Sequence, residues 1–358
     1  KKESFKRLLR CRAKGFALQR GQKERVKEKM SAPKILVTNQ ISPCGVDKLK
    51  EYGFNLVWSK SNLVSDVKEM IGDVDGIIAR MTPVKEELID AAPNLKIIGM
   101  HGVGLDGIAT KYAEEKGIAV IHTPEANAIS VAANVMNMIL NLSKHTIEAD
   151  HALRVEDRFQ DRDKYVGHDI AGKTLAIVGL GRIGRRLAVM AGCGFAMRVI
   201  AYDPYISTER MKEVANGVEK METMDELLAQ ADYLTFHTQM TPEMKGFVNY
   251  DLLRKMKPTA YLINEMRGAL VVDDDLKRAL EEGVIAGAAL DVFNKEPTPV
   301  DFPLLKAPHL IATPHTGAST YESMDRTILT LAEEFHHFFS DEKVNYLANP
   351  GYENKKGE

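Results

Sequence analysis

The chain has 358 residues, a length that predicts two domains rather than one hydrophobic core. Its apolar fraction of 44% is ordinary for a globular protein, and no apolar run is long enough to cross a bilayer, so no membrane partner is expected. Residues 1–29 carry 12 Lys/Arg and 3 Asp/Glu, whereas residues 30–358 carry 36 Lys/Arg and 47 Asp/Glu. The net negative charge of residues 30–358 argues against a nucleic-acid partner.

The three cysteines, Cys11, Cys44 and Cys193, are scattered along the chain without a C-x-x-C pair. This pattern argues against a disulfide framework and against a zinc site. It fits a protein of the reducing cytoplasm, and no metal is expected.

The basic segment 1–29 has two interpretations. Phe5–Arg10 is Arg-rich and partly amphipathic, which is typical of a targeting arm. Alternatively, Met30 is the true start and the segment is upstream sequence, because a strand-like run, Lys34–Thr38, follows Met30 closely. The second interpretation is favoured, and the tail is expected to be poorly ordered.

Between residues 34 and 122, short apolar runs alternate with charged amphipathic stretches, which predicts a domain with a parallel sheet. The predicted strands are Lys34–Thr38, Asn55–Trp58, Gly76–Ala79, Lys96–Gly99 and Ile118–Ile121. The predicted helices are Val46–Tyr52, Val64–Ile71, Lys85–Ala91 and Thr110–Lys116. The first strand-to-helix turn carries no glycine fingerprint, so this domain is not expected to bind a nucleotide.

A long helical pattern, residues 126–150, leads into a second alternating region, residues 174–312. Its predicted strands are Thr174–Val178, Arg198–Tyr202, Tyr233–His237, Tyr261–Asn264, Ile285–Val292 and Leu310–Thr313. Another long helix, residues 319–340, is expected to return to the first domain. The second domain is therefore predicted to be inserted into the first.

One stretch indicates what the second domain binds. The apolar run Leu175–Val178 is followed by three glycines, Gly179, Gly181 and Gly184, and then by a helical pattern and a second apolar run that ends at Asp203. A G-x-G-x-x-G between strand and helix, with an acidic residue about 20 positions further on, is the fingerprint of dinucleotide binding.

Each part of this motif has a physical role. Gly179 allows a tight turn, Gly181 lets the backbone approach a pyrophosphate, and Gly184 lets the helix pack close to the strand. The N–H groups at the helix start then face the phosphates. Asp203 would accept hydrogen bonds from the adenosine ribose and repel a 2′-phosphate, which favours NAD over NADP.

These patterns predict an α/β fold of two Rossmann-like, doubly wound domains. Residues 129–319 form the NAD-binding domain, which includes the linking helix, and residues 30–128 with 320–350 form a discontinuous substrate domain. The active site is expected in the cleft between them, beyond the carboxyl ends of the strands.

Three reactive side chains follow predicted strands of the second domain: Arg267, Glu296 and His315. Hydride exchange between a nicotinamide and a hydroxy acid needs a group that takes the hydroxyl proton and can return it, and His is suited to this role. A neighbouring carboxylate would fix the imidazole tautomer and stabilise imidazolium. A guanidinium would hold the substrate carboxylate with paired, charge-assisted hydrogen bonds.

Each of these residues alone also has a structural interpretation. His315 follows a proline near a helix start, Arg267 precedes a glycine and could cap a turn, and Glu296 precedes a proline and could be solvated. Their combination behind a nucleotide fingerprint favours the catalytic hypothesis.

The motifs resemble those of the NAD-dependent D-2-hydroxyacid dehydrogenase family, which includes D-3-phosphoglycerate dehydrogenases and glyoxylate/hydroxypyruvate reductases. The resemblance runs from about Lys34 to Pro350. Besides the glycine motif it rests on three runs: Asn264-x-x-Arg267-Gly268, Asp291-Val-Phe-x-x-Glu296-Pro297 and Thr313-Pro-His315-x-Gly317. It implies reversible hydride transfer between NAD(H) and a small 2-hydroxy/2-oxo acid, with D-3-phosphoglycerate as the first candidate and glyoxylate or hydroxypyruvate as the second.

The resemblance also implies roles for single residues. Arg267 would bind the substrate carboxylate and carbonyl, Glu296 would pair with His315, and His315 would be the acid and base. The implied cofactor contacts, besides the glycines and Asp203, are the backbone N–H groups of Arg182 and Ile183, the residues His237 and Gly317, and Asp291, which would hydrogen-bond the nicotinamide carboxamide.

In the first domain the resemblance implies a substrate-carboxylate loop, residues 102–106. The backbone N–H groups of Val103 and Gly104 would receive the carboxylate, although a plain strand-to-helix turn is the alternative. Arg80 would reach a substrate phosphate, and an ordinary surface arginine is equally consistent with the sequence.

The sequence departs from the family pattern beside the arginine, where Glu265 and Met266 replace small residues, and at Gln239 and Ala133. These departures leave the substrate open. Because family members are usually dimers through the cofactor domain, a homodimer is expected. The chain ends soon after Pro350, so no regulatory domain is expected.

Two other functions compete with the dehydrogenase hypothesis. A non-catalytic, NAD-sensing corepressor-like protein that recognises peptides is the alternative from another class. Formate oxidation is disfavoured, because relatives with that activity pair the histidine with Gln where this chain has Glu296.

Overall fold

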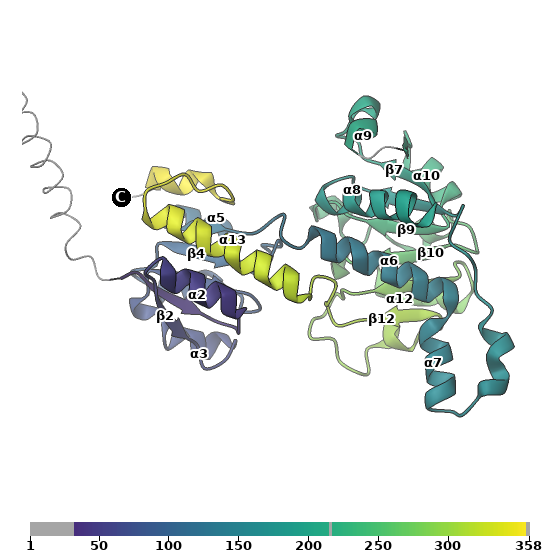
Figure 1. Ribbon diagram of the computed structural model, residues 1–358, viewed down its shortest axis with the longest axis horizontal. Helices are drawn as coiled ribbons and strands as arrows, with labels where there is room; N and C mark the ends of the chain where they lie inside the picture. Colours follow the sequence, from purple (N-terminus) through teal and green to yellow (C-terminus); the bar gives the residue numbers. More distant parts are fainter. Residues whose placement is uncertain (1–31, 215–216, 356–358) are drawn as a thin grey trace, which may run out of the picture. The chain divides into compact units, whose positions relative to one another are not determined.

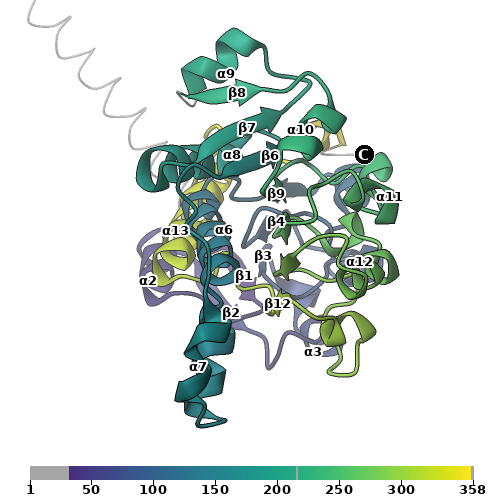
Figure 2. The same cartoon turned by 90° about the vertical axis from the view of Figure 1, so that its right-hand side faces the viewer.

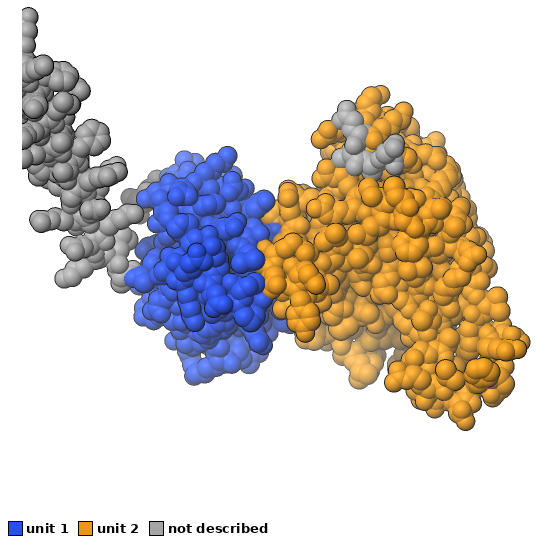
Figure 3. Space-filling view, viewed as in Figure 1, with its two compact units in different colours: residues 1–123, 327–358 blue, residues 124–326 orange. Residues whose placement is uncertain are grey.

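The computed structural model describes residues 32–214 and 217–355, so the tail expected to be poorly ordered lies outside the described residues. The chain divides into two compact units (Figure 3): unit 1 comprises residues 32–123 and 327–355, and unit 2 comprises residues 124–214 and 217–326. Each unit is built on one parallel sheet, which confirms the predicted α/β fold. No helix in the described part of the chain is long and apolar enough to cross a membrane.

Unit 1 contains a five-stranded sheet in the order β2-β1-β3-β4-β5. Strands β2 and β4 of this sheet are labelled in Figure 1. Its strands are β1 (Lys34–Val37), β2 (Asn55–Trp58), β3 (Gly76–Ala79), β4 (Ile97–Met100) and β5 (Ala119–Ile121). Its helices are α2 (Pro43–Glu51), α3 (Val64–Lys68), α4 (Glu86–Asp90), α5 (Thr110–Glu115) and α13 (Tyr321–Phe339), which enters the unit at Thr327.

Helices cover both faces of this sheet because successive residues of a strand point to opposite faces. Ile77 and Ile98 belong to the cluster that includes α3, α4 and α5. Their neighbours Ile78 and Ile97 belong to the opposite cluster, with α2 and with Phe335 of α13. Strands buried on both faces read as continuous apolar runs, which is why the sequence predicts them well.

Unit 2 contains a seven-stranded sheet in the order β12-β11-β10-β9-β6-β7-β8. Its strands are β6 (Thr174–Val178), β7 (Arg198–Tyr202), β8 (Val218–Lys220), β9 (Tyr233–Phe236), β10 (Tyr261–Asn264), β11 (Gly287–Leu290) and β12 (Leu310–Ala312). Its helices are α6 (Ala128–Lys144), α7 (Thr146–Arg154), α8 (Arg182–Val189), α9 (Thr208–Val214), α10 (Met224–Gln230), α11 (Tyr250–Leu253) and α12 (Asp273–Glu281).

The core of unit 2 follows the same rule. Leu175 and Ile177 of β6 pack in the cluster that contains α6 and α8, whereas Ala176 and Val178 pack with α10, α11 and α12. Figure 2 shows α6 and α12 on opposite sides of the strands. The sheet order places β9 and β7 on either side of β6, so connections lead away in both directions from the carboxyl end of β6. In doubly wound folds such a point is where ligands bind.

The helical pattern over residues 126–150 is not one helix. Helix α6 ends at Lys144, His145 adopts a left-handed conformation with a φ of 52°, and α7 begins at Thr146. The carbonyl oxygen of Ser143 accepts the N–H of His168 at 2.8 Å, so a distant segment uses this carbonyl. The break thus depends on a tertiary contact that local sequence does not reveal.

Candidate active site

The turn between β6 and α8 shows why glycine stands at each motif position. Gly179 has a φ of +90°, and a Cβ there would lie 2.6 Å from Cγ2 of Thr238. A Cβ on Gly184 would lie 2.3 Å from the carbonyl oxygen of Gly179. By contrast, a Cβ on Gly181 would meet its nearest atom, the carbonyl oxygen of His237, only at 3.9 Å. The backbone at Gly181 therefore borders open space at the start of α8, as approach to a pyrophosphate requires.

Asp203 lies directly after β7 and supports this turn. Its buried carboxylate accepts the N–H of Leu180 at Oδ2 over 2.9 Å and the N–H of Tyr205 at Oδ1 over 3.0 Å. A carboxylate oxygen can accept two hydrogen bonds, so each oxygen retains capacity for a ribose hydroxyl. Asp203 thus supports the conformation of the glycine turn, which the sequence motif does not indicate.

The remaining cofactor candidates near this turn are Arg182, Ile183 and His237. Arg182 and Ile183 begin α8, so their N–H groups have no acceptor within the helix, and the Arg182 side chain pairs with Glu125 at 3.3 Å. His237 follows β9, and its Nε2 lies 3.2 Å from Oγ1 of Thr235. Burial lowers the pKa of His237 to about 4, so its imidazole is neutral near pH 7.

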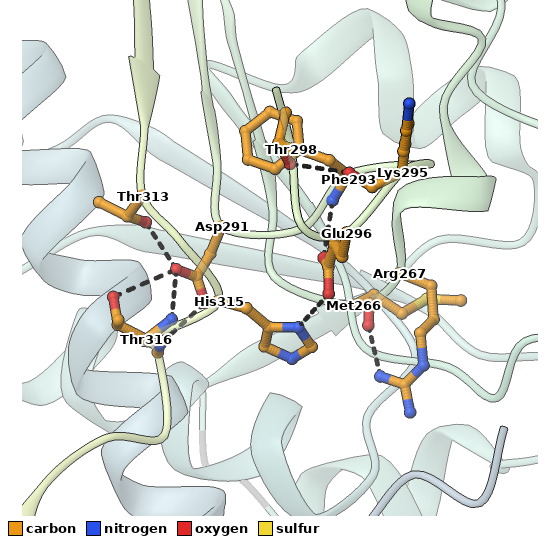
Figure 4. A network of polar contacts seen from close by, with 11 residues as sticks. Met266, Arg267, Asp291, Phe293, Lys295, Glu296, Thr298, Thr313, His315 and Thr316 are labelled. Carbon is orange, nitrogen blue, oxygen red and sulfur yellow. Dashed lines mark hydrogen bonds and ion pairs between the residues drawn. The ribbon is translucent and has the colours of Figure 1, made fainter. Parts of the chain in front are cut away.

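Arg267, Glu296 and His315 follow three neighbouring strands, β10, β11 and β12. Nδ1 of His315 lies 2.8 Å from Oε2 of Glu296, and the other carboxylate oxygen of Glu296 accepts the N–H of Phe293 at 3.0 Å (Figure 4). The His315 side chain is 54% exposed, so a small molecule can reach it. The pairing assigns the Nδ1 proton to the contact with Glu296 and leaves Nε2 for exchange with a substrate.

A buried amide holds the loop that carries Arg267. The Asn264 side chain donates to the carbonyl oxygen of Arg267 at 2.9 Å and accepts the N–H of Met266 at 3.0 Å. Nη1 of Arg267 donates to the carbonyl oxygen of Met266 at 2.6 Å. In Figure 4 the Arg267 guanidinium and the Nε2 edge of His315 point in the same direction. The sequence motif includes Asn264, but only the structure shows that its side chain fixes the loop that carries Arg267.

Asp291 anchors the loop that carries His315. Its Oδ1 accepts Oγ1 of Thr313 at 2.6 Å and both the N–H (2.8 Å) and Oγ1 (3.4 Å) of Thr316, while its Oδ2 accepts the N–H of Gly317 at 2.7 Å. Its carbonyl oxygen accepts the N–H of His315 at 2.8 Å. These contacts hold His315 in a left-handed conformation with a φ of 55°, which is uncommon outside glycine. Asp291 is therefore a positioning residue, a role that the sequence did not predict.

Gly268 lets the loops after β10 and β11 meet backbone to backbone. A Cβ on Gly268 would lie 2.0 Å from the carbonyl carbon of Phe293 and 2.3 Å from the nitrogen of Asn294. Asn294 also donates to the carbonyl oxygen of Val271 at 3.1 Å. The glycine after Arg267 is thus the sequence signal for the contact that joins the arginine loop to the glutamate loop.

Unit 1 holds three of the four residues predicted to bind substrate, and the fourth, Arg267, lies in unit 2. Arg80 follows β3, and His101, Val103 and Gly104 follow the neighbouring strand β4. The N–H groups of Val103 and Gly104 donate to no residue that the structure describes. The His101 ring is buried with Nε2 unpartnered among described residues, and burial and then the charge of Arg80 lower its pKa to about 4. This edge of unit 1 therefore carries several hydrogen-bonding groups suited to an anion.

Comparison with known proteins identifies the family. Residues 136–317 match the family described as D-isomer specific 2-hydroxyacid dehydrogenase, NAD binding domain. The chain belongs to this family. It is 40% identical over 306 residues to a D-3-phosphoglycerate dehydrogenase of Bacillus subtilis, covering 85% of this chain and 57% of that protein. The chain thus spans less than two thirds of the length of this relative.

Solved structures agree with the assignment. A D-lactate dehydrogenase from Aquifex aeolicus, complexed with NAD and lactic acid, is 28% identical with a TM-score of 0.76, covering 88% of this chain and 99% of that one. An NADPH-dependent glyoxylate/hydroxypyruvate reductase from Sinorhizobium meliloti, in complex with NADP and malonate, is 27% identical with a TM-score of 0.77, covering 89% and 98%. The predicted family and the predicted NAD cofactor are confirmed, and the roles of single residues stay predictions.

Proposed function

We propose that this chain catalyses reversible hydride transfer between NAD(H) and a small D-2-hydroxy acid. The proposal rests chiefly on one observation: a half-exposed imidazole, His315, pairs with Glu296 at 2.8 Å in the unit that carries the glycine turn. A protein that only binds NAD has no need of such a pair. When bound, NAD(H) supplies or accepts the hydride.

The residues of unit 2 divide the remaining work. In the oxidation, Nε2 of His315 takes the hydroxyl proton, and the carboxylate of Glu296 stabilises the imidazolium through Nδ1. In the reduction, the same nitrogen returns the proton to the oxygen that was the carbonyl. Arg267 binds the substrate carboxylate and polarises the carbonyl with its planar guanidinium, which suits paired hydrogen bonds. Asn264 and Asp291 keep the two loops in place.

We propose D-3-phosphoglycerate as the hydroxy acid. The Bacillus subtilis relative bears the name of that activity, and unit 1 offers a cation, Arg80, and two backbone donors, at Val103 and Gly104, for a phosphate and a carboxylate. Hydroxypyruvate and glyoxylate, named for the Sinorhizobium meliloti structure, lack a phosphate for Arg80. In this proposal unit 1 is the substrate domain and unit 2 is the NAD-binding domain.

The test is the initial rate of NADH oxidation with 3-phosphohydroxypyruvate, hydroxypyruvate and glyoxylate. The phosphorylated acid should give the highest kcat/KM. Arg80→Gln should lower its kcat/KM about tenfold, the scale of one charge-assisted contact, and leave that of hydroxypyruvate unchanged. A preference for hydroxypyruvate with no effect of Arg80→Gln would replace the proposed substrate. No turnover of any acid, with NADH binding intact, would favour the peptide-binding alternative.

We further propose a homodimer that works in the cytoplasm. The segment from α7 through η2 (Phe159–Tyr165) to Val166 exposes five large apolar side chains: Ile147, Leu153, Val155, Phe159 and Val166. Apolar surface concentrated in this way is typical of an interface with another chain. The three cysteines are scattered along the sequence without a C-x-x-C pair, which supports a reducing compartment.

A further inference from the structure

Glu265 is an acidic residue where the family pattern has a small one, and one of its carboxyl oxygens lacks a hydrogen-bond partner in the part of the chain that the structure describes. It follows β10 directly, between Asn264 and Met266. Its Oε1 accepts Nδ2 of Asn134, on α6, at 2.9 Å. Its Oε2 is buried and has no hydrogen-bond partner among the described residues. A buried polar atom without a partner costs free energy, which suggests that a ligand supplies the missing contact.

The backbone of Gly317 lies close to Oε2, at a place where a side chain would not fit. A Cβ on Gly317 would lie 2.6 Å from Oε2 of Glu265 and 3.0 Å from Oδ2 of Asp291. Any side chain at position 317 would therefore press on both carboxyl groups. The three residues come from loops after three neighbouring strands, β10, β11 and β12, so the sheet itself brings them together.

Asp291 is bonded within the protein, chiefly through Oδ1. Its two oxygens already accept from four donors, on Thr313, Thr316 and Gly317. Three of these donors contact Oδ1, and the N–H of Gly317 contacts Oδ2. Of these two acids, Glu265 is the one with a carboxyl oxygen, Oε2, that has no hydrogen-bond partner among the described residues.

The protonation of Glu265 decides which contact it can make. Burial, and then the negative charge of Asp291, raise the pKa of Glu265 to about 9, and the contact with Asn134 only partly opposes this. Glu265 is therefore a neutral acid near pH 7. Because Oε1 accepts from Asn134, the proton lies on Oε2, which makes Oε2 a donor that needs an acceptor.

The sheet order indicates which part of NAD meets this donor. The pyrophosphate site is the turn after β6, and Asp203, the ribose residue, follows β7 on one side of it. Glu265 follows β10, on the other side. A dinucleotide that lies across the point where the strand order reverses places its nicotinamide half on the β9–β11 side.

We propose that Glu265 recognises the cofactor by donating a hydrogen bond from Oε2 to the carboxamide oxygen of the nicotinamide. Asn134 orients the carboxyl group from α6, and the absence of a side chain at Gly317 lets Oε2 keep its place beside Asp291. The inference rests on the NAD-binding part of the proposed function and is independent of the substrate.

The test compares two ligands on the purified protein without substrate. NADH carries the nicotinamide and ADP-ribose lacks it, so the ratio of their dissociation constants isolates the contact. Glu265→Ala should weaken NADH binding about tenfold and leave ADP-ribose binding unchanged, which also shows that the variant is folded. Glu281→Ala, which removes an exposed carboxylate on α12, should change neither constant.

Glu265→Gln distinguishes a neutral donor from a carboxylate. Its amide oxygen can accept from Asn134 while its NH2 group replaces the proton on Oε2, so NADH binding should stay within about threefold of the wild type. Loss of NADH affinity in Glu265→Gln as well as in Glu265→Ala would overturn the proposed donor. An equal change for both ligands, or none in Glu265→Ala, would overturn the contact itself. Wild-type protein that binds neither ligand would instead reject the proposed function.

Discussion

The carboxyl-terminal edges of the two sheets differ in how their polar groups are used. At the edge of unit 2 most of these groups are bonded to one another: Asp291 accepts from four donors, and Glu296 accepts from Phe293 and contacts His315. Oε2 of Glu265 differs, since it has no partner among the described residues. At the edge of unit 1, the N–H groups of Val103 and Gly104 donate to no described residue. Nε2 of His101, on the same edge, is likewise unpartnered among the described residues.

This difference separates two kinds of site. Groups that must transfer a proton or orient a substrate need a fixed geometry before the substrate arrives, and mutual hydrogen bonds provide it. Groups that bind an anion must be able to donate a hydrogen bond to it, and donors that are unpaired within the protein have this ability. Substitutions at the edge of unit 2 should therefore change turnover and the order of the loops. In unit 1, the buried, unpaired imidazole of His101 should instead affect the free energy of unfolding.

The largest expected effect is on turnover. His315→Asn keeps a residue that tolerates the left-handed backbone at this position but removes the proton-transferring nitrogen. We expect kcat to fall by about 10²–10⁴-fold, the usual contribution of a general acid or base. Steady-state rates with the best 2-oxo acid measure it, and NADH fluorescence titration serves as the control, because the cofactor should bind as before. A variant that keeps most of its activity would mean that the bonded edge of unit 2 is not the catalytic one.

A smaller effect concerns His101 and pH. The folded protein holds the pKa of this imidazole at about 4, whereas its ordinary value is 6.5. As the pH falls from 6.5 towards 4, the unfolded chain takes up a proton that the folded chain does not, so the folded state loses stability. The loss from this residue should reach about 2.5 kcal/mol by pH 4.5, and His101→Gln should lack it.

Urea unfolding at pH 7 and at pH 4.5 measures this difference. The single tryptophan of the chain, Trp58, lies in β2 and reports on unit 1. The difference between the wild type and His101→Gln cancels the other titrating groups. If acid destabilises both proteins equally, then His101 is not held neutral in the folded state, and the contrast between the two edges weakens.

Much of the fold could be predicted because buried parallel strands carry a local signal. The predicted strands Asn55–Trp58, Gly76–Ala79 and Arg198–Tyr202 coincide with β2, β3 and β7. Strand β8 (Val218–Lys220) was missed, because it has three residues at the end of the sheet and only Val218 is buried. Pairing with β7 stabilises this strand, and its own apolar pattern is too short to predict it.

The candidate site likewise has features that could be predicted from the sequence and features that could not. The glycine turn and the contact between Glu296 and His315 were predictable, since residue type and spacing after strands carry that information. The supporting contacts of Asn264 and Asp291 were not predicted, because each depends on which loop lies within hydrogen-bond reach after folding. A sequence therefore indicates candidate catalytic residues more readily than the residues that hold them in place.

The smallest expected effect tests those supporting contacts. Asp291→Asn has the same shape, but its NH2 group must face either the N–H of Gly317 or the donors of Thr313 and Thr316, so at least one hydrogen bond to a charged acceptor is lost. We expect the free energy of unfolding to fall by about 2 kcal/mol. Urea unfolding followed by circular dichroism measures this loss.

Hydrogen exchange locates the same effect, because the amides of Thr316 and Gly317 should exchange faster in Asp291→Asn than in the wild type. Asp301→Asn, a change to an exposed carboxylate of the same unit, is the matched control and should leave stability and exchange unaltered. Unchanged exchange at residues 313–317 in Asp291→Asn would show that the His315 loop keeps its shape without the carboxylate. The order at the edge of unit 2 would then come from packing, and hydrogen bonds would no longer distinguish it from unit 1.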